Sequence, residues 1–356
     1  MRYVGANKSA IAAIVREKAI ILRGRRKTIA MKTKVAIVAG GNSSEYEVSL
    51  RSAGNIKNTL DKNLYDAVIV LIHGDKWQAV VSDTEKYDID KNDFSYADAG
   101  GKHVFDFAYI TIHGTPGENG IVQGYFELLG MKYSCCGVLA AALTFNKYMC
   151  NRYLESVGAN PAPAIWLHKD EEADPEKIIA VTGLPCFVKS NVSGSSFGVS
   201  KVTRMEDVGA AVANAFAEGD EVIVESFLKG TEVTCGIYKT KDKTVVLPLT
   251  EVVSKNEFFD FNAKYNGQSE EITPARLDAA LTADIQARTS RYYDALDCKG
   301  LVRIDYIITE DGIPHVLEVN TTPGMTDTSF IPQQVRAAGL SLTDVFTDII
   351  EDAKIR

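Results

Sequence analysis

The first clear element of this chain is an apolar run, KVAIVAG at Lys34–Gly40, which ends in glycine. A short run that is apolar throughout is typical of a strand buried on both faces of a parallel sheet. A helical pattern follows at Ser49–Leu60, and strand-like runs follow at Val68–Ile72 and Ala108–His113. Strands that alternate with helices predict a parallel, Rossmann-like α/β domain at this end of the chain.

The rest of the chain is richer in strands. Helices are expected at Thr144–Val157, Glu206–Glu218 and Leu277–Leu296, and strands at Cys186–Ser190, Glu221–Phe227, Val233–Lys239 and Thr244–Thr250. Between the last of these strands and the last helix lies a long polar loop, Ser254–Thr273. The runs Leu301–Thr309 and Pro314–Asn320 flank an Asp-Gly pair, which is a strong turn signal, and together they predict a β-hairpin.

The end of this hairpin carries the strongest chemical signal. Arg303 and Asp305 lie two apart on one strand, and Glu318 and Asn320 lie two apart on the other, so each pair faces one side. Pairing of the strands would bring the two carboxylates together. Two carboxylates and an amide oxygen are the hard ligands that Mg²⁺ prefers when it holds nucleotide phosphates. A solvated hairpin face is the alternative interpretation.

A second signal is a lysine at a strand end, Lys189, followed by the small-residue loop Asn191–Gly198. Backbone N–H groups and an ammonium in such a loop suit phosphate binding. The loop does not contain the Walker A pattern, and a surface turn would explain it equally well.

Three further segments have polar groups at strand ends or in loops. The segment Gly40–Ser49 follows the first strand but lacks the G-x-G-x-x-G pattern, which disfavours a nicotinamide site. Within it, Glu45 lies at the carboxyl end of the strand, the edge where open α/β sheets bind ligands. His113 begins the segment HGTPGENG after another strand, where a structural role and a functional role are both reasonable. The aromatic-rich segment 258–267 lies in the long polar loop, and loops of this length are often lids.

The bulk composition excludes several classes of protein. The formal net charge is −8, which disfavours nucleic-acid binding, and no apolar run reaches the roughly 18 residues of a membrane span. The six cysteines are scattered without metal-ligand spacing, as in reduced cytosolic proteins. Residues 1–30 are different, with eight basic residues against Glu17, and we expect an extension without a defined fold or a true start at Met31.

Taken in order, these segments resemble the D-alanine–D-alanine ligases from about Lys34 to Gly339. The matching motifs include Gly40-Gly41 through Glu45, His113-Gly114, Gly194-Ser195-Ser196, Ala263-Lys264-Tyr265, Arg303-Ile304-Asp305 and Glu318 through Gly324. Ser190 stands where the family commonly has proline, and residues 1–30 have no counterpart.

The resemblance implies a two-lobed ATP-grasp fold after the first domain, with boundaries at 31–135, 136–225 and 226–356 and a lid at 254–273. It implies ATP contacts from Lys147, Lys189, Glu225, Leu228, Glu232 and Lys264. It also implies two Mg²⁺ ions, which Mn²⁺ could replace, on Asp305, Glu318 and Asn320. It also implies that Glu45 binds the first D-alanine, that Ser329 binds the second, and that Glu45, Ser195 and Tyr265 latch the lid. Arg303 and the Gly324 N–H would form the oxyanion hole, with His113 also in the catalytic site.

The activity implied is the ATP-dependent joining of two D-alanines for peptidoglycan synthesis, in the cytoplasm, by a homodimer without nucleic-acid or membrane partners. Three alternatives stay open: a D-alanine–D-lactate ligase, an ATP-grasp ligase for other carboxylates and amines, and a non-catalytic nucleotide-binding regulator. Tyr265 in the lid favours an amine over a hydroxyl nucleophile, because depsipeptide-forming relatives commonly lack this tyrosine.

Overall fold

The computed structural model describes residues 31–171, 173–192, 199–254 and 269–356, so Ser195, Lys264 and Tyr265 lie outside the described residues. Three sheets organise the fold. In the first, β1 (Thr33–Gly40) pairs in parallel with β2 (Tyr65–His73) and with β7 (Phe107–Ile110), and β7 pairs in parallel with β8 (Lys132–Tyr133). On the β2 side, β3 (Lys76–Val80) and β4 (Lys86–Asp88) add an antiparallel edge. A separate hairpin, β5 (Tyr96–Asp98) with β6 (Gly101–His103), completes this part of the chain.

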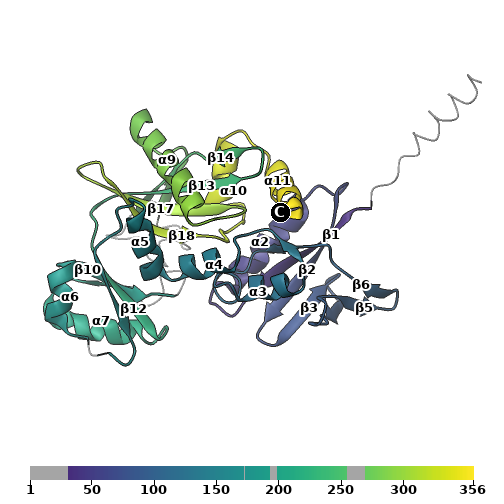
Figure 1. The fold of residues 1–356 in the computed structure, drawn as a ribbon, viewed down its shortest axis with the longest axis horizontal. Helices are drawn as coiled ribbons and strands as arrows, with labels where there is room; N and C mark the ends of the chain where they lie inside the picture. Colours follow the sequence, from purple (N-terminus) through teal and green to yellow (C-terminus); the bar gives the residue numbers. More distant parts are fainter. Residues whose placement is uncertain (1–30, 172, 193–198, 255–268) are drawn as a thin grey trace, which may run out of the picture.

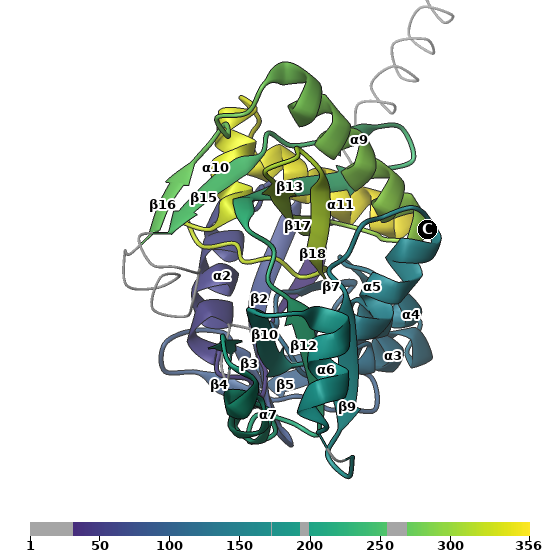
Figure 2. The same ribbon diagram turned by 90° about the vertical axis from the view of Figure 1, so that its left-hand side faces the viewer.

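Alternate residues of β1 face two different cores. Val35 and Ile37 pack with α2 (Tyr46–Thr59) and with the last helix, α11 (Leu342–Ile355). Ala36 and Val38 face the opposite core, which includes α3 (Ile121–Leu128). Figure 2 shows α2 and α3 on opposite sides of the sheet. The sheet is therefore buried on both faces, as its uninterrupted apolar strand predicts.

The second sheet is antiparallel and small. It has the order β11-β10-β12-β9, with β9 at Ala164–His168, β10 at Cys186–Ser190, β11 at Ser200–Val202 and β12 at Glu221–Ser226. Helices α6 (Pro175–Thr182) and α7 (Val208–Ala215) cover one face, and the short 3-10 helix η1 (Met205–Asp207) precedes α7.

The third sheet is antiparallel and has the order β16-β15-β13-β17-β18, with β14 paired to β13. Its strands are β13 (Gly230–Lys239), β14 (Thr244–Val246), β15 (Thr250–Ser254), β16 (Ser269–Ile272), β17 (Val302–Thr309) and β18 (Pro314–Asn320). Helices α5 (Lys147–Ser156) and α9 (Ala279–Ala295) share a core with it, and α10 (Phe330–Ala337) contacts β13.

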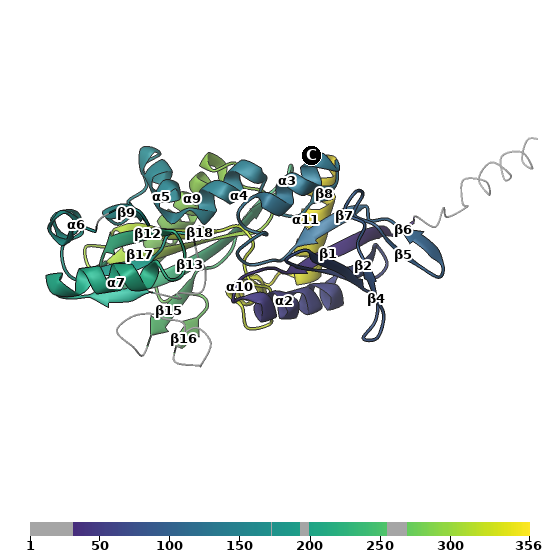
Figure 3. The same ribbon diagram turned by 90° about the horizontal axis from the view of Figure 1, so that it is seen from below.

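The first sheet lies at one end of an elongated molecule and the two antiparallel sheets lie at the other (Figure 1). Helix α4 (Val138–Phe145) lies between them, and β15 and β16 extend away from the body of the molecule (Figure 3). The proposed domain boundaries stay a prediction, and α11, which falls within the range 226–356, contacts β7 and β8 of the first sheet. No helix in the described ranges is long and apolar enough to cross a membrane.

Several predicted elements were wrong in detail. The helix expected at Thr144–Val157 is divided at Asn146, whose side chain accepts a hydrogen bond from the Met149 N–H at 3.0 Å and so begins a new helix, α5. The strand expected at Thr244–Thr250 is two strands, β14 and β15, because Pro248 has no N–H to donate to a neighbouring strand. The end of the predicted polar loop is a strand, β16, which pairs with β15.

Candidate active site

The hairpin of β17 and β18 places four polar side chains at one point. In the register of the two strands Arg303 is opposite Asn320, and Asp305 is opposite Glu318, as the sequence pattern predicted. Asn320 Nδ2 lies 3.2 Å from Asp305 Oδ2 and 3.4 Å from Glu318 Oε1. The two carboxylates are therefore held beside one another through a common neighbour.

Arg303 neutralises much of this negative charge. Its guanidinium donates two hydrogen bonds of 2.8 Å to the two oxygens of Asp305 and lies 3.9 Å from Glu318. Burial opposes the charge on Arg303, but the two carboxylates outweigh it and raise the pKa of the guanidinium. The Thr234 hydroxyl donates a further 2.5 Å hydrogen bond to Asp305. Arg303 is thus a permanently cationic group at the centre of the site.

Two cavities meet at this cluster. Arg303, Glu318 and Phe330 line both of them, and the Phe330 ring centroid lies 5.3 Å from the Arg303 guanidinium carbon. The first cavity, of about 330 Å³, lies toward the first sheet, and the second, of about 700 Å³, lies between the two antiparallel sheets. A chemical step at their junction can draw on groups from all three sheets.

The second cavity contains most of the residues assigned to ATP. Lys189, Glu225, Leu228 and Glu232 all line it, together with Asp305. Lys189 Nζ forms a 2.5 Å ion pair with Glu225. Burial disfavours the Lys189 ammonium, but Glu225 and nearby acidic groups outweigh that effect and raise the pKa of Lys189. The lysine is therefore charged at neutral pH and suited to an anionic ligand.

Lys147 lies on the other side of the junction, in the lining of the first cavity. Burial lowers its pKa, while the nearby Glu318 carboxylate acts in the opposite direction. Its helix is anchored to the end of β10, since the Lys147 N–H donates to the Asn191 carbonyl at 3.2 Å and the Tyr148 N–H donates to the Asn191 side chain at 2.8 Å. Lys147 and Lys189 are thus positioned by linked segments.

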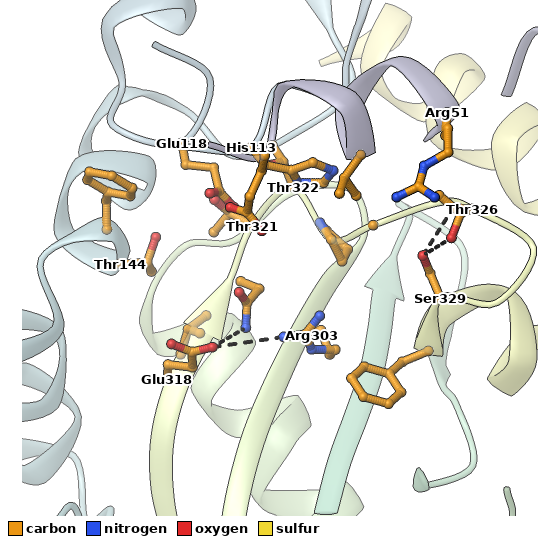
Figure 4. A pocket seen from close by; sticks show the side chains of 18 of the residues that line it. Arg51, His113, Glu118, Thr144, Arg303, Glu318, Thr321, Thr322, Thr326 and Ser329 are labelled. Atoms are coloured by element: carbon orange, nitrogen blue, oxygen red, sulfur yellow. Dashed lines mark hydrogen bonds and ion pairs between the residues drawn. The ribbon is translucent and has the colours of Figure 1, made fainter. Parts of the chain in front are cut away.

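The first cavity also contains the residues predicted from strand ends of the first sheet. Glu45, which is the N-cap of α2, and the buried His113 both line it. His113 Nε2 has no hydrogen-bond partner within the described part of the chain. Glu118 lies nearby, accepts the Gly114 N–H at 2.7 Å, and has its pKa raised by burial. Figure 4 shows His113 and Glu118 beside Thr321 and Thr322.

Glycines bring these segments close to one another. Gly41 has φ of +97°, and a Cβ there would lie 2.6 Å from Ile112 Cγ2. A Cβ on Gly324 would lie 2.9 Å from Ser329 Oγ. Gly324 and Ser329 both line the first cavity, so the proposed oxyanion and carboxylate positions are adjacent.

The structure adds lining residues that the sequence interpretation did not single out. Arg51 and Glu271 line the first cavity, and Phe187 and Lys201 line the second. Arg51 lies on α2, six residues after the N-cap Glu45, and its place in the cavity depends on the contact of this helix with the loop after β18. No sequence pattern marks Glu271, which reaches the cavity only because β16 pairs with β15.

The donor set fits a divalent cation that is held together with phosphate groups. Among the described residues no three His, Cys, Asp or Glu side chains cluster as a closed metal site. Asp305, Glu318 and Asn320 offer two carboxylates and one amide oxygen at the junction of the cavities. Mg²⁺ is commonly bound in this way, with substrate phosphates completing its shell.

Two antiparallel sheets with a cation-lined cavity between them, and carboxylates at its inner end, define an ATP-grasp enzyme. Two family models match the chain: "D-ala D-ala ligase N-terminus" over residues 34–136 and "D-ala D-ala ligase C-terminus" over residues 154–351. The chain belongs to the D-alanine–D-alanine ligase family.

Individual relatives agree with this assignment. The D-alanine–D-alanine ligase of Phocaeicola vulgatus is 59% identical over 322 residues, which cover 90% of this chain and 99% of the relative. The VanG D-Ala:D-Ser ligase from Enterococcus faecalis has a TM-score of 0.81 at 30% identity, covering 90% of this chain and 98% of that one. The Bacillus anthracis D-alanine–D-alanine ligase complexed with ATP has a TM-score of 0.72 at 28% identity, covering 91% and 98%.

Proposed function

We propose that this chain joins two D-alanine molecules to D-alanyl-D-alanine at the expense of ATP, through a D-alanyl phosphate, in the cytoplasm and for peptidoglycan synthesis. The observation that supports this most is the junction of the two cavities at Arg303 and Glu318. A nucleotide in the second cavity would present its terminal phosphate to an amino acid in the first.

The chemistry explains why such a junction is needed. A carboxylate is a poor electrophile, and transfer of a phosphoryl group to it creates a good leaving group. The amine of the second D-alanine then attacks the carbonyl carbon, and phosphate leaves. Negative charge must be neutralised first on the phosphoryl group and then on the tetrahedral oxyanion. Lys147, Lys189 and Arg303 are the cations that the structure places around the junction.

On the nucleotide side we assign Lys147 and Lys189 to the phosphates, and Glu225, Leu228 and Glu232 to the adenine and ribose. Their common position in or beside the second cavity supports these roles. Asp305, Glu318 and Asn320 would hold two Mg²⁺ ions, which Mn²⁺ could replace, and the ions would supply positive charge to the phosphates. Lys264, outside the described residues, is proposed to reach the γ-phosphate from the lid.

On the amino-acid side, Glu45 would bind the first D-alanine ammonium and Ser329 the second D-alanine carboxylate. Arg303 and the Gly324 N–H would stabilise the tetrahedral oxyanion, with His113 close by. All five residues line the first cavity, which supports one shared site. The hydrogen-bonded trio of Glu45 with Ser195 and Tyr265 stays a proposal about a lid outside the described residues.

The decisive experiment is phosphate release from ATP across a panel of D-amino and D-hydroxy acids, with product analysis. The expected result is release that depends on D-alanine and gives the dipeptide. Predominant D-alanyl-D-lactate in a mixture of D-alanine and D-lactate would favour the depsipeptide alternative. Phosphate release that depends on other acids of the panel, and on neither D-alanine nor D-lactate, would indicate another ATP-grasp ligase.

We also propose a homodimer. Three apolar side chains on the neighbouring helices α3 and α4 are strongly exposed: Ile121 at 60%, Leu128 at 89% and Leu139 at 80%. Exposed apolar side chains on two neighbouring helices suit an interface between two copies of one chain. Sedimentation velocity of the purified protein would test the assembly.

A further inference from the structure

The face of α2 that borders the first cavity carries a cation. Glu45, Val48 and Arg51 follow one another at intervals of three residues, so they share one side of the helix, and all three line the cavity. Figure 4 shows the Arg51 guanidinium pointing toward Thr326 and Ser329. Within the described ranges Arg51 has neither an ion pair nor a hydrogen bond, so its charge is not consumed by a protein carboxylate there.

The position of Arg51 relative to Ser329 is set by packing. The residue next to Arg51, Ser52, is buried, and its Oγ accepts the Met325 N–H at 3.1 Å. One turn further on, Asn55 donates to the Met325 carbonyl at 2.6 Å. Both backbone groups of Met325 are thus bound to α2, which fixes the loop that ends at Ser329.

The start of α10 is the second, independent feature that attracts an anion. Ser329 is the N-cap, but its hydroxyl bonds the Thr326 hydroxyl at 2.7 Å instead of capping the helix. The N–H groups of Phe330 and Ile331 have no acceptor in the part of the chain that the structure describes, and Pro332 has no N–H. Free N–H groups and the helix dipole favour a carboxylate at this point.

The other charges of the first cavity define the orientation of an amino acid. Glu45, Glu118, Glu271 and Glu318 also line the cavity and would repel a second carboxylate near them. Lys147 is a further cation of this lining, but it is assigned above to the ATP phosphates. Arg303 donates two of its N–H groups to Asp305 and is assigned above to the oxyanion of the tetrahedral intermediate. The end of the cavity between Arg51 and the start of α10 is therefore the position where a carboxylate gains most.

We propose that Arg51 is a specificity-determining residue that binds the free α-carboxylate of the second, attacking substrate. This inference rests on the proposed function and adds the reason for choosing the acceptor. Arg51 selects amino or hydroxy acids with a free carboxylate over the corresponding amides or esters, whatever atom attacks.

The test uses the full-length enzyme and three variants: Arg51→Gln, Arg51→Lys and, as a matched control, Lys57→Gln on the same helix. Phosphate release is measured against D-alanine concentration, which separates the two subsites, and D-alaninamide is compared as the acceptor. Thermal unfolding of each variant provides the check on folding.

In Arg51→Gln we expect the KM of the second subsite to rise about tenfold, as for loss of one charge-assisted hydrogen bond, with the first subsite and the KM for ATP unchanged. The preference for D-alanine over D-alaninamide should fall by a similar factor, Arg51→Lys should lie between, and Lys57→Gln should match the wild type. An active wild type with an unchanged second KM and unchanged amide discrimination in Arg51→Gln would overturn the role of Arg51 alone. A wild type inactive with D-alanine would instead overturn the proposed function.

Discussion

At the scale of single residues, we expect the negative charge of Glu318 to be essential for turnover. It lies opposite Asp305 in the hairpin, lines both cavities and raises the pKa of Arg303. Glu318→Gln is nearly isosteric, so we expect the fold to survive while a hard anionic ligand for Mg²⁺ is removed and turnover is almost abolished.

The matched control is Glu310→Gln in the turn of the same hairpin, where the side chain is 75% exposed and pairs with Lys229. Phosphate release with saturating D-alanine and a range of Mg²⁺ concentrations is the measurement. Full activity of Glu318→Gln would show that the metal site is elsewhere.

Substitution of Arg303 tests a different step, the formation of the tetrahedral intermediate. Because Arg303 lines the first cavity together with Gly324 and is held in place by Asp305, we expect it to act on the tetrahedral intermediate more than on ATP binding. Loss of one oxyanion donor typically costs about 2.7 to 4 kcal/mol of barrier, so Arg303→Met should lower kcat about a hundredfold or more. Steady-state kinetics should show a KM for ATP close to that of the wild type, and a defect confined to ATP binding would contradict this role.

At the scale of elements, α2 links the first sheet to the loop that follows β18 of the third sheet. Ser52→Ala removes the acceptor of the buried Met325 N–H, and an unsatisfied buried donor costs about 1 to 3 kcal/mol. We expect lower stability in denaturant and a higher KM for D-alanine, because the loop at Gly324 and Ser329 loses one of its two anchors. Asn58→Ala, exposed on the same helix, is the control, and equal behaviour of the two variants would refute the linkage.

Elements also show how far the sequence could be interpreted. The buried strand at residues 34–40 and the hairpin around Asp311-Gly312 were predicted well, because each combines an apolar or alternating pattern with a local turn signal. The break at Asn146 was missed, since a capping residue within an apolar helical pattern is easily taken as interior. The strand β16 and the position of Arg51 depend on contacts with distant segments, which no local pattern reports.

At the scale of the whole molecule, the site exists only where three sheets meet. Glu45, His113 and Arg303, which were predicted from separate motifs, line one cavity with Ser329, which the family resemblance implied. The order of the motifs along the chain predicted the family, but not that α11 closes the core of the first sheet through contacts such as Phe346 with Tyr109, whose ring centroids are 5.5 Å apart. A chain that lacked its last helix would therefore be expected to lose the N-terminal part of the site as well.

At the same scale, removal of the basic segment at residues 1–30 tests which part of the chain the enzyme needs. The family model begins at residue 34, and β1 begins at Thr33. We expect a chain that begins at Met31 to keep full phosphate release and an unchanged unfolding temperature.

A chain that begins at Ile37 is the control, since it removes Val35 and Ala36, which are fully buried and pair with both β2 and β7. Burial of such side chains contributes about 1.5 to 3 kcal/mol for a residue of the size of valine, so this control should unfold at a clearly lower temperature. Loss of activity or folding in the chain that begins at Met31 would show that the basic segment is an integral part of the enzyme.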